Sequence, residues 1–150
     1  MDDARSDGRD VVRPVLIDSS KRRLLLIPSA PDSEVCWTVP TVPMRPGETV
    51  RRAAVRHLRR VAHLPALRIP PLIGRLSHKG APQGVQYVVV VRPAAESWPP
   101  AVCFALAPEA RWWTTTELRL AGALVEPADL LDFMDGYWDG WLPDGEISLE

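Results

Sequence analysis

The sequence predicts a mixed α/β fold in which one sheet is covered by a helix on each side. Apolar runs typical of strands occur both before and after an arginine-rich segment whose apolar residues recur with a helical period. A second helical segment follows the last of these runs. Because strands and helices come in groups rather than in strict alternation, we expect a mixed sheet and not a doubly wound parallel one. A chain of 150 residues suits a single domain.

The N-terminal third predicts strands. Residues 1–10 are polar and are expected to form a disordered tail. Residues 11–18 and 22–29 are two β-type runs joined by a short polar turn, as in a hairpin. Residues 36–40 predict a short strand that Pro40 closes.

Residues 49–64 give the clearest helix, which Pro65 ends. Arg51 interrupts its apolar side, and we expect that side chain to extend outward along its aliphatic stem. The predicted apolar side consists of Val50, Ala54, Val55, Leu58, Val61 and Ala62. The predicted polar side consists of Arg52, Arg56, Arg59, Arg60 and His63.

Residues 66–78 predict an interrupted strand, and the continuous apolar run 85–93 predicts a strand buried on both faces. Residues 111–114 predict another short strand. Thr114 and Glu117 then form a capping-box pattern that opens a short helix.

The last helix is expected to begin near Pro127 and to end before Pro143, with residues 143–150 as a C-terminal tail. The domain is therefore expected to span residues 11–142. Phe133, Tyr137 and Trp141 recur at four-residue spacing, which predicts a shared face that packs in the core or contacts a partner.

Charge is distributed unevenly along the chain. The net charge is −1, which argues against nucleic acid as the partner. Residues 51–60 nevertheless hold five arginines, and the chain beyond Arg119 holds only acidic charges. The two cysteines suggest neither a disulfide framework nor a metal site. The sequence shows neither a signal peptide nor an apolar run that could span a membrane, so we expect a cytoplasmic protein.

The segment around the first helix has a recognisable order. A Trp-x-x-Pro motif begins at Trp37, the triplet Pro-Gly-Glu ends at Glu48, and the helix carries Arg56 and Leu58. This order resembles the Nudix hydrolase superfamily, whose box reads Gly-x5-Glu-x7-Arg-Glu-U-x-Glu-Glu-x-Gly-U, where U is aliphatic. The box fits residues 42–64 without a gap, and the likeness covers about residues 11–142. It implies an α/β/α sandwich with the box helix on one side of a mixed sheet and a C-terminal helix on the other.

The sequence departs from that box where the chemistry of the family resides. His57 stands at the catalytic Glu, and Arg60 and Val61 stand at the metal-binding pair. Members with an intact box hydrolyse nucleoside diphosphates linked to another moiety, with Mg²⁺ or Mn²⁺. Mg²⁺ requires several oxygen ligands, which Glu48 alone cannot supply, and Arg60 would repel the ion. The resemblance thus implies a degenerate box, with no metal and no other cofactor.

These observations favour a non-hydrolytic binding or regulatory module. Its ligand would be a nucleotide, a phosphorylated metabolite or a partner protein, and a homodimer is compatible with the family resemblance. Arginine forms forked hydrogen bonds to phosphate, so the arginine-rich helix can bind a phosphate directly. The predicted ligand-binding residues are Arg45, Glu48, Arg56, His57 and Arg60.

Four alternatives remain open. The arginines can form a solvated helix face on which Arg56 makes a structural ion pair, or they can contact a nucleic-acid backbone. The protein can be a hydrolase that uses His57 as a base, or acids outside the box such as Glu96 or Glu109 with Mg²⁺. It can also be an interaction protein whose contact surface is the aromatic, acidic C-terminal segment.

Overall fold

The computed structural model describes most of the chain. The described residues are 10–30, 35–61, 66–77, 84–94, 98–99, 102 and 107–149, with Val61 described for its backbone only. The predicted N-terminal tail, apart from Asp10, lies outside these ranges.

Within the described part of the chain, ten strands form one continuous sheet. Their order is β10-β6-β7-β1-β2-β3-β9, with β4 paired to β1, β5 to β7 and β8 to β2. The strands are β1 (Val11–Asp18), β2 (Arg23–Pro28), β3 (Cys36–Thr38), β4 (Val42–Pro43), β5 (Leu67–Arg68), β6 (Leu72–Ser77), β7 (Val85–Pro93), β8 (Arg111–Thr114), β9 (Leu124–Glu126) and β10 (Gly145–Ser148). The helices are α1 (Val50–Val61), α3 (Thr115–Leu120) and α4 (Leu130–Trp138).

Strand β1 lies at the centre of the sheet and makes it mixed. It runs parallel to β7, with Val12 opposite Tyr87, and antiparallel to β2, with Ile17 opposite Leu24. The predicted hairpin of the first two strands is confirmed. In β7, Val88 to Val91 have no exposed surface, which confirms that this run is buried on both faces.

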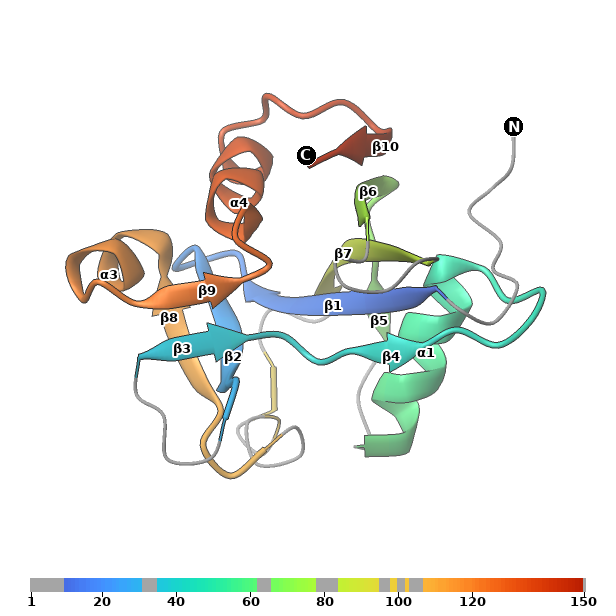
Figure 1. Ribbon diagram of the computed structural model, residues 1–150, viewed down its shortest axis with the longest axis horizontal. Coiled ribbons are helices and arrows are strands. Elements are labelled where there is room, and N and C mark those ends of the chain that lie inside the picture. The colour runs from blue at the N-terminus through green and yellow to red at the C-terminus, as the bar shows by residue number, and fades with distance from the viewer. Residues whose placement is uncertain are drawn as a thin grey trace.

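The two helices α1 and α4 cover opposite faces of this sheet (Figure 1). Side chains alternate along β1, so Val12 and Leu16 pack with α1 whereas Val15 and Ile17 pack with α4. Two separate apolar clusters result, one on each face. The predicted architecture, a mixed sheet between the arginine-rich helix and a C-terminal helix, is confirmed.

Helix α1 packs through a small-residue face. Val50, Ala54 and Leu58 of the predicted apolar side are buried against the sheet, together with Ala53, which was not predicted there. The Val61 side chain and Ala62 lie outside the described residues. Val55, predicted on that side, is half-exposed instead. Arg51 extends outward as predicted, and its Nη2 donates to the Ile69 carbonyl at 2.7 Å. No helix in the described ranges has the length and apolarity needed to cross a membrane.

Two C-terminal predictions are wrong. Helix α4 ends at Trp138 rather than near Leu142, because Gly140 adopts a φ of 77° and the Trp141 amide closes the end on the Gly136 carbonyl. Residues 145–148, predicted within a tail, form β10 and pair parallel with β6 from Gly145↔Leu72 to Ser148↔Arg75. The physical reason is that apolar residues alternate with polar ones here, and the half-buried Ile147 and Leu149 pack against the α4 side of the core. This alternation is typical of a strand, but the prediction of a tail did not take it into account.

Gly74 in β6 leaves the space into which the C-terminus packs. A Cβ atom at Gly74 would lie 2.8 Å from Leu149 Cδ1 and 3.2 Å from Phe133 Cε1. Gly74→Ala is therefore expected to lower the free energy of unfolding by about 1–3 kcal/mol through overpacking. Urea denaturation measures this change, with Thr116→Ala on exposed α3 as the control. In a Leu149→Ala background the cost of Gly74→Ala should shrink, and equal costs in both backgrounds would show that Leu149 does not pack on Gly74.

Candidate functional site

A tight turn brings the chain into α1. Gly47, with a φ of 77°, allows the Pro46-Gly47 turn, in which the Glu48 amide donates to the Arg45 carbonyl at 3.0 Å. Thr49 then caps the helix, because its Oγ1 accepts from the Arg52 amide at 3.2 Å. The turn fixes Glu48 directly in front of the helix.

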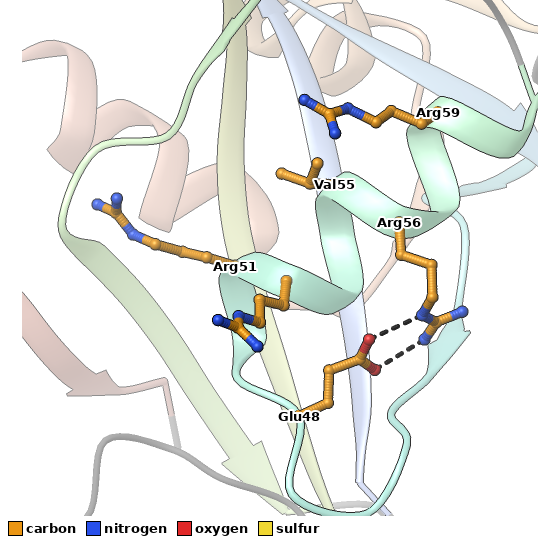
Figure 2. Close-up of a pocket in the computed structure, with 6 residues that line it drawn as sticks. Glu48, Arg51, Val55, Arg56 and Arg59 are labelled. Atoms are coloured by element: carbon orange, nitrogen blue, oxygen red, sulfur yellow. Dashed lines mark hydrogen bonds and ion pairs between the residues drawn. The ribbon is translucent and has the colours of Figure 1, made fainter.

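Glu48 and Arg56 form a two-pronged ion pair across the start of α1 (Figure 2). Arg56 Nε donates to Glu48 Oε2, and Arg56 Nη2 donates to Glu48 Oε1, each at 2.8 Å. The Arg45 amide also donates to Oε1 at 2.9 Å, and Arg56 Nη2 reaches the Pro43 carbonyl at 2.9 Å. The predicted structural ion pair of Arg56 is thus present, and it ties β4 and the turn to the helix.

The environment of Glu48 stabilises its ionised form. The hydrogen bonds from Arg56 are the main cause, partial burial opposes them, and the Arg45 amide and the nearby positive charges add to them. Together they lower the pKa of Glu48 from an ordinary 4.5 to about 2. In return, the carboxylate raises the pKa of Arg56. Both groups therefore keep their charges throughout the physiological range.

Beside this pair lies an open groove of about 400 Å³, hereafter the arginine groove. In Figure 2, Arg51, Val55 and Arg59 extend to one side of α1, and the Glu48–Arg56 pair lies across from them. The side chains that line the groove are Glu48, Arg51, Arg52, Val55, Arg56 and Arg59.

The positive charges of the groove are only partly neutralised. Glu48 balances Arg56, whereas no described carboxylate forms an ion pair with Arg51, Arg52 or Arg59. Both Arg52 and Arg59 are exposed. Counted over the described residues, the groove thus presents three guanidinium groups that no carboxylate neutralises, along one side of one helix.

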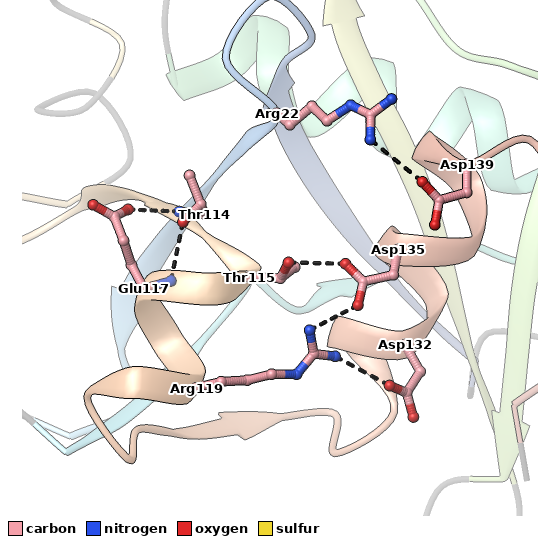
Figure 3. Close-up of polar contacts among 8 residues, drawn as sticks. All are labelled: Arg22, Thr114, Thr115, Glu117, Arg119, Asp132, Asp135 and Asp139. Carbon is pink, nitrogen blue, oxygen red and sulfur yellow. Dashed lines mark hydrogen bonds and ion pairs between the residues drawn. The ribbon is translucent and has the colours of Figure 1, made fainter.

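The acidic C-terminal half differs from α1 because arginines neutralise much of its charge. Arg119 on α3 binds Asp135 at 2.7 Å and Asp132 at 3.1 Å, both on α4, and Arg22 reaches Asp139 at 3.3 Å (Figure 3). The predicted capping box of α3 is also present, with Glu117 and Thr114 each accepting from the other's amide. The charge imbalance is therefore sharper on α1 than on α4.

The predicted site residues divide into two groups. Glu48 and Arg56 line the arginine groove, but Arg45, His57 and Arg60 are not among its lining residues. His57 is half-buried, and burial first, then the charges of Arg56 and Arg60, lower its pKa. The imidazole is therefore neutral at neutral pH.

The sequence prediction did not select residues 51, 52, 55 and 59 as site residues. Their shared position on one side of the helix could have identified them.

The residues of the box region do not fit a divalent cation. Both oxygens of Glu48 accept hydrogen bonds from Arg56, and Oε1 accepts a further one from the Arg45 amide. Exposed Arg60 occupies one of the metal-binding positions of the resembled box. Among the residues that the structure describes, no group of three or more His, Cys, Asp or Glu side chains could hold a metal ion. Glu109 is exposed, and Glu96 lies outside the described residues.

The three predicted aromatic residues of the C-terminal segment, and Trp98, differ in exposure. Phe133 is buried in the core, Tyr137 is half-buried, and Trp141 is 79% exposed. Trp98 is a core residue whose Nε1 donates to the Ile17 carbonyl at 2.7 Å, so its indole N–H is already used. Only Trp141 of these four offers a large open apolar surface.

The sequence matches no protein-family model and no curated protein. The structure is similar to the Ap4A hydrolase of C. elegans, with 14% identity, a TM-score of 0.61 and coverage of 89% of this chain and 98% of that one. It is similar to a NUDIX hydrolase from Nitrosomonas europaea, with 18% identity, a TM-score of 0.59 and coverage of 95% and 80%. It is also similar to the C-terminal domain of mouse MUTYH, solved in complex with human PCNA, with 23% identity, a TM-score of 0.58 and coverage of 91% and 92%. This chain therefore has the Nudix fold.

Loss of the Glu48 charge should destabilise the fold. Glu48→Gln is expected to lower the free energy of unfolding at pH 7 by about 1–3 kcal/mol, because it weakens hydrogen bonds to a charged partner. The pKa of Glu48 is depressed on folding, so its contribution is complete above about pH 4.5 and is lost as the pH falls toward 2. Urea denaturation at several pH values measures this.

The matched control is Glu109→Gln, a charge loss at an exposed carboxylate, which should leave stability nearly unchanged. A stability difference between wild type and Glu48→Gln that stays constant from pH 7 to pH 2 would contradict the ion-pair assignment.

Proposed function

We propose that this Nudix-fold protein is a binding module that recognises a phosphate-containing ligand through α1 and does not hydrolyse it at the box. The observation that carries the proposal is the charge of α1. Three of its arginines are uncompensated among described partners, while the one box carboxylate that remains is held by Arg56. The helix is therefore suited to receive an anion rather than a metal cation.

Arginine supports phosphate recognition for geometric as well as electrostatic reasons. The planar guanidinium presents several N–H donors in a fixed fork that matches two oxygens of a phosphate. The side chains of Arg52 and Arg59 make no side-chain hydrogen bond with other described residues, so their donors are available to a ligand. A protein-borne cation of this kind can replace a metal ion in binding a phosphate.

Such a cation cannot replace the metal in hydrolysis. A metal ion lowers the pKa of bound water enough to generate hydroxide near neutral pH, and a guanidinium does not. Neutral His57 could accept a proton, but it points away from the groove arginines, so the base and the charge stabilisation that phosphoryl chemistry requires would not act on one phosphate. These considerations favour binding without turnover.

A thermal-shift panel tests this proposal. Nucleotides, nucleotide sugars, dinucleotides and sugar phosphates would each be added with Mg²⁺ and again with EDTA. We expect at least one ligand to raise the melting temperature equally in both conditions, because a bound ligand stabilises the folded state by linkage and no metal is needed. Chromatography of the same mixtures should recover the ligand intact.

A shift that requires Mg²⁺, or hydrolysis that EDTA stops, would instead support the hydrolase alternative. The double substitution Arg60→Glu/Val61→Glu serves as the matched comparison, since it returns carboxylates to the metal-binding positions of the resembled box. It should gain affinity for Mn²⁺, measured by calorimetry, relative to wild type. Unchanged Mn²⁺ affinity would contradict the alignment of the box on α1.

A second candidate function is binding of a protein partner through the C-terminal segment. Trp141, 79% exposed just beyond α4, favours it, because exposed tryptophan is enriched among residues that dominate interface energies. The structural similarity to a MUTYH domain solved with PCNA is compatible with such a role.

Trp141→Ala tests this second function without disturbing the core that Phe133 and Met134 form. If Trp141 anchors self-association, light scattering at increasing protein concentration should show a dimer for wild type and a monomer for the variant. Leu120→Ala, at another exposed apolar side chain, is the control. If wild type and Trp141→Ala have the same molecular mass in solution across the concentration range, self-association through Trp141 is excluded.

A further inference from the structure

The arginine groove is lined by Glu48 and Arg56 of the box, but it lies on the side of α1 away from His57. Successive residues of a helix are rotated by about 100°, so His57 points roughly opposite to Val55. Val55 lines the groove, whereas His57 is half-buried and does not. A ligand in the groove would therefore contact a different side of α1 from the one that carries His57.

The groove is electrostatically unfavourable in the absence of a ligand. The first turn of α1 holds Arg51 and Arg52 and no acidic residue, although the positive end of the helix dipole disfavours cations there. A bound anion would relieve this effect. Local violations of helix rules of this kind are expected at functional sites.

The arginines that line the groove have different roles. Arg56 is held by Glu48 and the Pro43 carbonyl, and Arg51 donates to the Ile69 carbonyl at 2.7 Å. Both are fixed by the fold. Arg52 and Arg59 have exposed side chains that are free to turn toward a ligand. The Cα atoms of these two lie two helical turns apart, about 10 Å along the axis, so together they span more than one phosphate group.

We propose that the arginine groove binds a compound with two or more linked phosphates, which Arg52 and Arg59 engage at two separate phosphate groups. This inference deepens the proposed function and rests on it, because the ligand must remain intact. Neutralisation of Arg56 by Glu48 leaves three positive charges for a ligand, which favours a polyanion over a monoanion.

Calorimetric titration of the full chain in Mg²⁺-free buffer tests the site, with tripolyphosphate and orthophosphate as probes. Wild type should bind tripolyphosphate more tightly than orthophosphate. Arg52→Ala/Arg59→Ala should weaken tripolyphosphate binding by about tenfold or more, since each charge-assisted hydrogen bond contributes about a factor of ten. Arg52→Lys/Arg59→Lys should retain part of the affinity, because lysine keeps the charge but loses the fork.

Lys21→Ala/Arg22→Ala is the matched control, because it removes two positive charges from the exposed turn between β1 and β2. Its affinity for tripolyphosphate should stay close to that of wild type. The groove variant Arg52→Ala/Arg59→Ala should also be at least as stable as wild type, since it removes repulsion. A marked fall in its melting temperature would overturn the proposal, because the arginines would then serve the fold.

The remaining outcomes separate this inference from the proposed function. Equal tripolyphosphate binding by wild type and the groove variant, or no binding by either, would overturn the groove as the site. Tighter binding of a ten-nucleotide single strand than of tripolyphosphate would overturn the ligand class in favour of a nucleic-acid backbone. If the protein hydrolyses diphosphate-linked compounds with Mg²⁺, and Arg52→Ala/Arg59→Ala does not change the rate, the proposed function is wrong. The tripolyphosphate titrations then decide separately whether the groove binds linked phosphates.

Discussion

The pairing of Glu48 with Arg56 is the interaction on which the arrangement of α1 depends. It joins the turn before the helix, the second turn of the helix and, through the Pro43 carbonyl, strand β4, which pairs with β1 at the centre of the sheet. The geometry is two-pronged and partly buried, a combination that makes an ion pair worth more than an ordinary surface pair. Because the carboxylate is committed to Arg56, it serves the fold and is withdrawn from metal chemistry.

This commitment decides how the remaining charges act. A free carboxylate at the mouth of the arginine groove would repel an anionic ligand, but Glu48 and Arg56 cancel each other at short range. The field of the groove therefore comes from Arg51, Arg52 and Arg59. On α4 the opposite holds, because Arg119 and Arg22 neutralise acids there. Within the described ranges, the charges of α4 are thus better compensated than those of α1, which keeps an excess of arginines.

Long periodic elements of this fold were predictable from sequence, whereas short edge elements were not. Strands β1, β7 and β8 were predicted with their observed bounds, because continuous β-branched or aromatic runs carry their own signal. Strands β9 and β10 are three and four residues long, and pairing with β3 and β6 defines them more than composition does. At the described positions the core face of α1 followed from its period, except that Val55 is half-exposed and Ala53 is buried.

The candidate site was harder to predict because two signals pointed to different faces of α1. The resemblance to the box directed attention to His57 and Arg60, through the positions where the family holds carboxylates. The helical phase instead gathers residues 51, 52, 55 and 59 with Glu48 and Arg56. The sequence alone cannot show which face is better suited to bind a ligand, because that depends on which arginines already bond to other parts of the protein. The structure shows Arg51 and Arg56 bound to the protein itself, and for this reason the proposed anion site depends on Arg52 and Arg59. The proposed site needs no carboxylate at positions 60 and 61, because the arginines that line the groove, and not a bound metal ion, would supply the positive charge.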